Sequence, residues 1–212
     1  MIHHLTVPIS DEAISALTVG DQVTVTGVIF TARDAAHKYM VEKFVKTGGQ
    51  PPESEQALYD LLKEKLDGGV IYHCGPVVAK ENGHWQFVAA GPTTSIREEV
   101  YQDLVIEHFN VKAVIGKGGM GPRTLAACQK QKAVYLHAVG GAGTLIAETV
   151  KEVEDVHKLK EFGMPEAFWQ IRVVEFPAVV TMDSHGTSIH AKVAAESEAK
   201  FCLLYTSPSP RD

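Results

Sequence analysis

Three short segments of the chain each place one basic side chain beside glycines or hydroxyl groups. The segments cover residues 31–37, 91–97 and 116–120, and their cations are Arg33, Arg97 and Lys117. Each segment has the pattern of a junction between a strand and a helix, where free backbone N–H groups and the helix dipole favour an anion. The sequence therefore predicts a site for a small anion that is assembled from three separate parts of the chain.

The choice of arginine in two of these segments is informative because arginine is scarce. The chain has five arginines against fifteen lysines. A guanidinium binds a carboxylate through a planar two-point contact that an ammonium group cannot reproduce. Arg33 and Arg97 are thus candidates for carboxylate recognition. A structural ion pair is the alternative, for example between Arg33 and either Asp34 or a distant glutamate.

The hydroxyl groups of the second segment have two possible uses. Thr93 and Thr94 follow a proline, which restricts the backbone there. Thr94 or Ser95 could cap the following helix. A catalytic threonine needs nearby cations, because its hydroxyl does not ionise at neutral pH without help. Arg97 and Lys117 could provide that field, so Thr93 is a candidate for either role.

Nucleotide and metal sites are disfavoured by the spacing of the residues. Lys117 lies in Gly-Lys-Gly-Gly, but the full phosphate-loop pattern GxxxxGK[ST] is absent. The ten histidines form no HxxxH or HxH pair; His3 and His4 are adjacent, at a terminus that we expect to fray. His37 lies four residues after Arg33, on the same helical face, where it could orient the site. His185 is treated as a structural turn residue. We therefore predict no metal ligands in this chain.

Composition narrows the class of protein. The 212 residues carry 20 basic and 26 acidic side chains, a net charge of −6, which argues against nucleic acid and anionic membranes as partners. The chain shows neither a secretory leader nor an apolar stretch long enough to span a membrane. Its three cysteines are scattered, as is typical of a reducing compartment. These features predict a cytoplasmic protein.

Hydrophobic periodicity predicts an α/β fold with a parallel or mixed sheet and Gly-rich loops between strands and helices. Helices are predicted from residue 32 to about 47 and over 53–66, 97–109 and 122–131. Strands are predicted over 21–30, 70–72, 77–79, 85–90, 113–115, 133–138, 170–175, 178–182 and 187–190. Asn82-Gly83 is typical of a hairpin turn.

The last residues have an unusual composition. Residues 202–212 can be back-translated without a mismatch into a transposase-type sequencing adapter read in frame; a flexible Ser/Pro-rich tail is the alternative. We therefore expect one domain over residues 1–200 and a non-native tail over 201–212, to which we assign no function.

Six motifs follow one another in a family-specific order: TARDAAH, IYHCGPV, GPTTSIR, GKGGM, GMPEAFW and FPAVVTMDSHG. Together they resemble the β subunit, or fused C-terminal domain, of class I iron-sulfur fumarases and of the related L(+)-tartrate dehydratases. The resemblance covers residues 1–200. It implies a swivelling β/β/α domain that closes on a separate cysteine-bearing α subunit, which holds a [4Fe-4S] cluster, in a higher oligomer of αβ units.

The resemblance also implies roles for individual residues. One iron of the cluster would act as a Lewis acid on the substrate hydroxyl. Arg33, Arg97 and Lys117 match positions that bind the two carboxylates of a small dicarboxylate, and Thr93 matches the proposed base for the C3 proton. Supporting positions are assigned to Asp34, His37 and Thr94. This agrees with the anion site expected from the residues alone.

Two departures from the family pattern lie beside these residues. Family loops commonly continue after the arginine with Met and an acid, whereas Arg97 is followed by Glu98 and Glu99. The first helix often has His-Lys-Arg, whereas this chain has His37-Lys38-Tyr39. Neither departure changes a residue with an assigned role, but both caution against assuming an identical substrate.

The leading hypothesis is therefore a hydro-lyase β subunit for the reversible hydration of fumarate to (S)-malate, a step of the tricarboxylic acid cycle. The run from His137 to Gly143 favours this substrate. One alternative is the β subunit of L(+)-tartrate dehydratase, which converts tartrate to oxaloacetate and water. The other is a small-anion binding module without catalysis.

Overall fold

The computed structural model describes residues 2–206, with side chains up to residue 201. Its main feature is a seven-stranded mixed sheet in the order β1-β2-β3-β6-β7-β9-β8. A further pairing between β2 and β9 closes five of these strands into a barrel. The strands are β1 (Ile2–Thr6), β2 (Gln22–Thr31), β3 (Val70–Tyr72), β6 (Ala113–Gly116), β7 (Val134–His137), β8 (Val150–His157) and β9 (Phe168–Met182). The predicted α/β class with a mixed sheet is confirmed.

The direction of the strands decides where the loops emerge. Strands β2, β3, β6 and β7 run parallel to their neighbours in this series, and β9 runs antiparallel to both β2 and β7. Every residue of β3 and β6 is buried, as expected for parallel strands that are covered on both faces. The carboxyl ends of the parallel strands therefore open at one edge. The first and third cationic segments begin there, at the ends of β2 and β6, whereas the second follows a strand outside this sheet.

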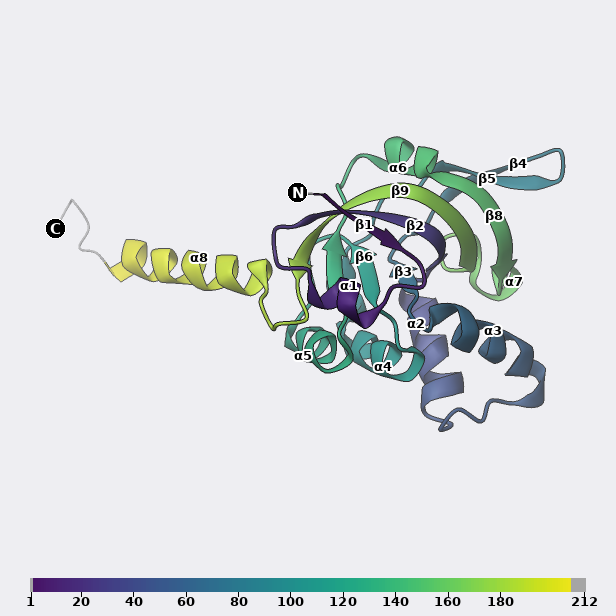
Figure 1. Cartoon of the computed structure of the whole chain (residues 1–212), viewed down its shortest axis with the longest axis horizontal. Coiled ribbons are helices and arrows are strands. Elements are labelled where there is room, and N and C mark those ends of the chain that lie inside the picture. The colour runs from purple at the N-terminus through teal and green to yellow at the C-terminus, as the bar shows by residue number, and fades with distance from the viewer. Residues whose placement is uncertain (1, 207–212) are drawn as a thin grey trace.

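Helices cover one side of this sheet (Figure 1). They are α2 (Asp34–Met40), which continues as a π-helical turn (Val41–Val45), α3 (Gln56–Leu66), α4 (Glu99–Phe109) and α5 (Pro122–Gln131). Short 3-10 turns precede α3 (Glu53–Glu55) and α4 (Ser95–Glu98). The short helices are α1 (Asp11–Ser15), α6 (Gly143–Thr149) and α7 (Leu159–Phe162). The hairpin of β4 (Val77–Glu81) and β5 (His84–Ala89) lies on the side away from α4 and α5.

The last described helix is separate from this body. Helix α8 (Ile189–Thr206) projects away from the sheet in Figure 1. Within residues 2–206, no helix is both long and apolar enough to cross a membrane. The expected tail, residues 201–212, falls mostly outside the described residues: the structure gives no side chains from residue 202 and no description of 207–212.

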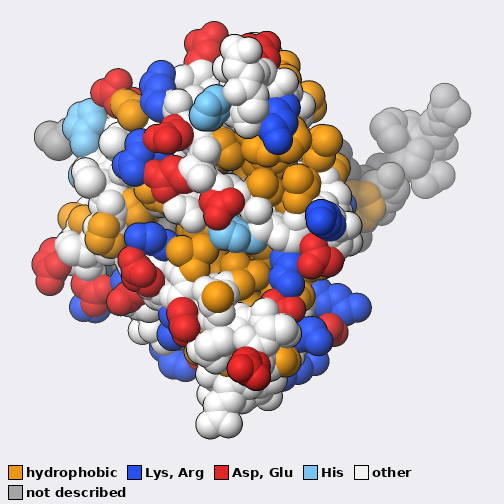
Figure 2. All heavy atoms as spheres, turned by 90° about the vertical axis from the view of Figure 1, so that its right-hand side faces the viewer, with side chains coloured by type: hydrophobic (Ala, Val, Ile, Leu, Met, Phe, Trp, Pro, Cys, Tyr) orange, Lys and Arg blue, Asp and Glu red, His pale blue; other side chains and the backbone are white. Residues whose placement is uncertain are grey.

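Two apolar cores hold the layers together. One fills the space between strands and includes Trp169, Tyr72 and Phe176. The other lies between the sheet and the helices and includes Phe44 and Phe109. The face shown in Figure 2 has apolar patches among interspersed acidic and basic side chains, without a continuous basic surface.

Most of the predicted elements are confirmed. The strand over 70–72 and the helix over 122–131 match β3 and α5 residue for residue, and the other helices differ by a few residues at their ends. Asn82 and Gly83 form the predicted turn between β4 and β5, both with positive φ (51° and 88°). The two strands predicted over 170–175 and 178–182 are one continuous strand, β9.

Two predictions were wrong. The strand predicted over 187–190 is a single bridge, between Met182 and Ser188, followed by helix α8. The Ser188 hydroxyl accepts a hydrogen bond from the N–H of Ala191 (3.3 Å), which is the geometry of a helix N-terminus. The terminus with His3 and His4, expected to fray, forms β1 in parallel register with β2, and His4 is bonded to Thr24 (2.8 Å between Nδ1 and Oγ1).

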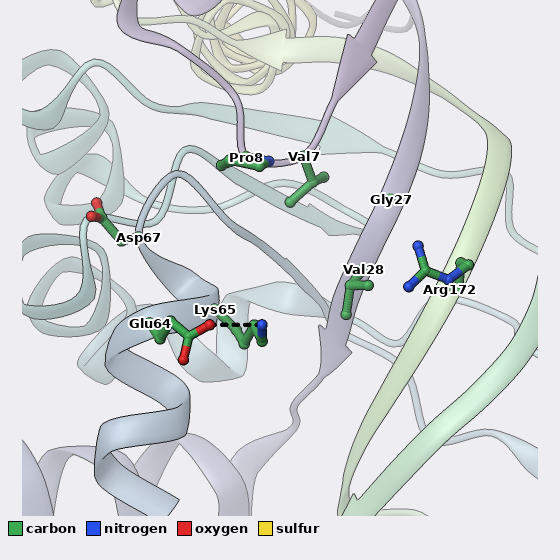
Figure 3. Close-up of a pocket in the computed structure, with 8 residues that line it drawn as sticks. All are labelled: Val7, Pro8, Gly27, Val28, Glu64, Lys65, Asp67 and Arg172. Carbon is green, nitrogen blue, oxygen red and sulfur yellow. Dashed lines mark hydrogen bonds and ion pairs between the residues drawn. The ribbon is translucent and has the colours of Figure 1, made fainter.

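The pairing of β2 with β9 changes register between Val25 and Gly27, and Gly27 itself is paired with Val173. Gly27 has a φ of 135°, and an added Cβ atom would lie 2.8 Å from the Val7 Cβ and 3.2 Å from the Val7 nitrogen. Val7 and Gly27 line a cavity of about 300 Å³ (Figure 3), which shares no residue with the three cationic segments. Only glycine therefore fits where β2 passes the end of β1.

We predict that Gly27→Ala lowers the free energy of unfolding by about 2–3 kcal/mol, because it combines backbone strain with a clash against the Cβ and backbone atoms of Val7. The matched control is Gly20→Ala. Gly20 also has a positive φ (101°), but no atom lies within 4 Å of the added Cβ. The control should cost about 1 kcal/mol. Equal losses for the two variants in urea unfolding would contradict the steric part of this explanation.

Candidate active site

The segment with Thr93 lies between the carboxyl ends of the parallel strands β3 and β6. The Thr93 N–H donates to the carbonyl of His73, just after β3 (2.8 Å). The Lys117 N–H, just after β6, donates to the Thr93 carbonyl (3.1 Å), and the Ser95 N–H donates to the Lys117 carbonyl (2.9 Å). Thr94 and Lys117 form a parallel bridge. Backbone hydrogen bonds thus bring the second and third cationic segments side by side.

Arg97 joins the second segment to the first. Its Nη2 donates to the Thr93 hydroxyl oxygen (3.1 Å), and its Nη1 lies 3.6 Å from Oδ2 of Asp34. The side chains of Arg97 and Asp34 are about half exposed (46% and 44%). A cation in contact with a hydroxyl oxygen stabilises the negative charge that forms when the hydroxyl loses its proton. This geometry is what a catalytic Thr93 would need.

Arg33 lies at the start of α2 and is held by a distant acid. Its Nε is 3.2 Å from Oε1 of Glu166, and the other Glu166 oxygen accepts the Ala35 N–H (3.0 Å). The structural ion pair considered for Arg33 is therefore present, with the distant glutamate rather than Asp34. The guanidinium packs on Gly75, where a Cβ would lie 2.4 Å from Nη1. The ion pair is made through Nε. No carboxylate of the described residues pairs with the two terminal nitrogens.

Lys117 differs from the two arginines in its surroundings. Among the described residues, no carboxylate lies within 4.0 Å of its ammonium group. The glycines that follow it, Gly118 and Gly119, have positive φ (83° and 77°), and its alkyl chain crosses Gly140, whose Cβ would lie 3.1 Å from Cδ. The lysine is thus held through its stem while its charged end has no acidic partner in this part of the chain.

Thr94 does not act as the expected cap. It stands at the N-cap position of the 3-10 turn, but its side chain makes no capping hydrogen bond and is exposed. The neighbouring Ser95 is buried and is used elsewhere. A side chain does cap the next helix, α5. The carboxylate of Glu99 accepts hydrogen bonds from the N–H groups of Gly121 and Arg123 (both 2.9 Å). Glu99 therefore caps α5 and fixes the far end of the Gly-rich loop.

A buried chain of hydrogen bonds connects the first and second cationic segments inside the protein. His37 contacts the Arg33 carbonyl through Nδ1 (3.0 Å) and the Gln102 side-chain amide through Nε2 (2.9 Å). The same amide contacts Nε2 of His73 (2.8 Å), whose Nδ1 contacts the Ser95 hydroxyl (2.8 Å). The Tyr135 hydroxyl donates to Ser95 Oγ (2.8 Å). The members come from five elements or loops and are all buried: His37, His73, Ser95, Gln102 and Tyr135.

Burial sets the protonation of the two histidines. It lowers the pKa of His37 to about 4 and that of His73 well below 6.5. A neutral His37 that donates from Nδ1 to a carbonyl must accept at Nε2, so Gln102 faces both histidines with its NH2 group. The oxygen and nitrogen of the Gln102 amide are therefore exchanged, so that the nitrogen faces the two histidines and the oxygen takes the position without a partner. His73 can accordingly donate from Nδ1 to Ser95.

Sequence reasoning selected Thr93, Arg97, Lys117, Arg33 and His37 as candidates, but it missed the residues that contact them. Ser95, Gln102 and Tyr135 have no motif of their own, and their partners lie 22 to 65 residues away in the chain. Gly116 was part of the third segment, yet its role is apparent only in space. An added Cβ at Gly116 would lie 1.9 Å from Ser95 Oγ and 2.8 Å from the Tyr135 hydroxyl.

The described side chains do not fit an iron-sulfur cluster. No group of three or more metal-ligating side chains is present among them. Cys74 and Cys128 belong to different cores, and burial raises the pKa of each thiol to about 12. Cluster ligands are thiolates, so neither cysteine suits that role. No step is assigned to such a group on this chain.

Comparison with known proteins identifies the family. The model of the fumarase C-terminus matches residues 2–193. The chain belongs to this family. The match confirms the resemblance that the six motifs indicate, in the family of class I fumarate hydratases and L(+)-tartrate dehydratase β subunits. Members of this family are lyase subunits.

Three relatives show how the chain compares with whole proteins. It is 48% identical over 197 residues to a putative fumarate hydratase class I of Geobacillus stearothermophilus, covering 92% of this chain but 35% of that protein. It is 40% identical over 189 residues to the L(+)-tartrate dehydratase subunit beta of Escherichia coli K12 (89% and 86% covered). It is 40% identical to the putative β subunit of Methanocaldococcus jannaschii (85% and 87%). The chain thus spans about a third of the first relative.

We predict that acid destabilises the fold through the buried histidines. Between pH 6.5 and about 4 the unfolded chain binds a proton at residue 37 that the folded chain does not, so stability falls as pH falls through this window. The limiting slope is about 1.4 kcal/mol per pH unit for each such histidine. Urea unfolding from pH 7 to 4 should therefore show a shallower slope for His37→Gln than for the unmodified chain. The exposed His84→Gln is the control, and an unchanged slope in His37→Gln would refute the assignment.

Proposed function

We propose that this chain is the β subunit of a cytoplasmic iron-sulfur hydro-lyase that hydrates fumarate reversibly to (S)-malate. The observation that carries the proposal is the contact between the Thr93 hydroxyl and the Arg97 guanidinium beside Lys117. The higher identity to a protein named for fumarate hydratase (48%) than to those named for tartrate dehydratase (40%) supports fumarate as the substrate.

The proposed chemistry divides the work among four residues. Arg33, Arg97 and Lys117 bind the two carboxylates of the substrate, and Thr93 takes the proton from C3 of malate or returns it to fumarate. Loss of that proton places further negative charge on the adjacent carboxylate. Fixed cations stabilise this charge more than they stabilise the ground state, which lowers the barrier. Asp34 and His37 support the arginines by the contacts described above.

The proposal includes a partner. A separate cysteine-bearing α subunit would hold the [4Fe-4S] cluster, and this chain would contribute a single fumarase-type domain over residues 1–200 to a higher oligomer of αβ units. Two of the relatives are named as β subunits of L(+)-tartrate dehydratase, which supports a division between two chains. The second candidate function is that of L(+)-tartrate dehydratase, whose substrate, tartrate, carries one more hydroxyl group than malate.

We predict that the chain, co-expressed without oxygen with its α subunit and reconstituted with iron and sulfide, turns over fumarate and (S)-malate but not L(+)-tartrate. Thr93→Ala should lower kcat by about 10²–10⁴, the usual contribution of a general base. Thr93→Ser should retain more activity because it keeps the hydroxyl. Thr47→Ala, an exposed threonine in the turn after α2, is the control.

The outcomes separate the candidate functions. Turnover of tartrate alone would show that the protein is the β subunit of an L(+)-tartrate dehydratase. If none of the three substrates is turned over but a dicarboxylate still binds, the result would favour the anion-binding module. Hydration of fumarate by this chain without partner or iron would contradict the proposed division of labour.

A further inference from the structure

Glu98 is a buried acid without a cationic partner. Its side chain has no exposed surface, and neither carboxyl oxygen accepts a hydrogen bond from an N–H or hydroxyl donor of the described residues. No described Lys, Arg or His nitrogen forms an ion pair with it. It lies between Arg97, which contacts Thr93, and Glu99, which caps α5. An ionised carboxylate in this position would pay a large desolvation cost.

The group that faces Glu98 is another carboxyl. Asp34, at the start of α2, lies close enough for a side-chain hydrogen bond between the two carboxyl groups. Oδ1 of Asp34 is buried without a partner, while Oδ2 is 3.6 Å from Arg97. Two carboxylates in one site repel each other, but a proton between them forms a strong hydrogen bond. One shared proton would therefore satisfy buried oxygens on both residues.

We propose that Glu98 is a positioning residue that holds a proton against Asp34 and so preserves the positive charge of the Arg97 site for a dicarboxylate. The inference rests on the proposed function for the identity of the ligand, and deepens it by adding a residue outside the predicted set. Glu98 acts through Asp34 and Arg97 and does not itself touch the substrate.

The balance of charge explains the effect. Arg33, Arg97 and Lys117 supply three cations, of which two are paired with Glu166 and Asp34. One positive charge is thus left over. An ionised Glu98 would cancel it, and the net charge of the site would then no longer attract a dianion.

The surroundings of Glu98 keep it protonated near neutral pH. Burial first, and then the hydrogen bond and charge of Asp34, raise its pKa to about 8, against a smaller opposite effect of Arg97. The other titratable groups around the pair are Tyr135 on β7 and His37 on α2. Both are neutral at pH 7 to 9, because burial raises the pKa of Tyr135 and lowers that of His37. The proton on Glu98 is therefore lost mainly above pH 8.

The first experiment follows the proton directly. The full chain is labelled with ¹³C at the glutamate carboxyl groups, and its NMR spectrum is recorded from pH 4 to 10. We expect one glutamate to titrate near pH 8, and this signal to be absent in Glu98→Gln but present in Glu107→Gln. Glu107 is the matched control because it lies on α4, which directly follows the turn that holds Glu98, and pairs with Lys130 at the surface. Titration of every glutamate below pH 6 would overturn the proposal.

The second experiment tests what the proton does. Calorimetry measures the Kd of succinate, a dicarboxylate that cannot be hydrated, for the complex with the α subunit. We expect Kd to rise on the order of tenfold between pH 7 and pH 9, as a new negative charge develops near Arg97. The rise should persist in Glu107→Gln and disappear in Glu98→Gln, whereas a merely structural role would give no such difference in pH dependence. The same rise in Glu98→Gln would overturn the positioning role.

These readouts separate the inference from the proposed function. Succinate binding with the expected pH dependence, but no turnover of fumarate, would reject the hydratase and support the role of Glu98. Turnover of fumarate with a pH-independent Kd would do the reverse.

Discussion

The arrangement of the site depends on one buried constraint, the hydrogen-bonded chain that runs through Gln102. Its members cross from α2 to α4, to the end of β3 and to β7, and each hydrogen bond satisfies a polar group that has no access to water. A buried polar group left without a partner costs about 1–3 kcal/mol. Movement of the first or the second cationic segment would break at least one of these bonds. The loops therefore hold fixed positions although they lie at the surface edge of the sheet.

The sheet makes such a chain possible. Because β2, β3 and β6 are parallel neighbours, their carboxyl ends bring residues that are far apart in sequence to one edge. Strand β9 pairs with both β2 and β7 and closes the barrel, so the edge cannot widen. Small residues complete the fit: Gly116 leaves room for Ser95 and Tyr135, and Gly75 leaves room for the Arg33 guanidinium. The fold thus brings the site residues together, and the absence of a Cβ atom at two glycines leaves room for their side chains.

The sequence predicted what is encoded locally. Strand β3, helix α5 and the Asn82-Gly83 turn have short-range signals and are found as predicted. Strand β8 carries alternating charges with no clear apolar face and was not predicted, because its pairing with β9 decides its conformation. The cations of the site were found from their glycine and hydroxyl neighbours. Glu166 and Gln102 were not, because what matters about them is a contact with residues 131 and 65 positions away. The roles of Thr93 and the three cations remain predictions.

The three cations also differ in how readily they can bind a ligand. Arg97 and Asp34 are half exposed and 3.6 Å apart, so their ion pair contributes little and an incoming carboxylate can compete for the guanidinium. Arg33 is more enclosed, and Glu166 lies 3.2 Å from its Nε, while no described carboxylate pairs with its terminal nitrogens. Lys117 has no acidic partner among the described residues and is the strongest source of unbalanced charge. In the proposed function, a dianion would therefore be oriented by Arg33, attracted by Lys117 and brought against Thr93 by Arg97, whose guanidinium contacts the Thr93 hydroxyl.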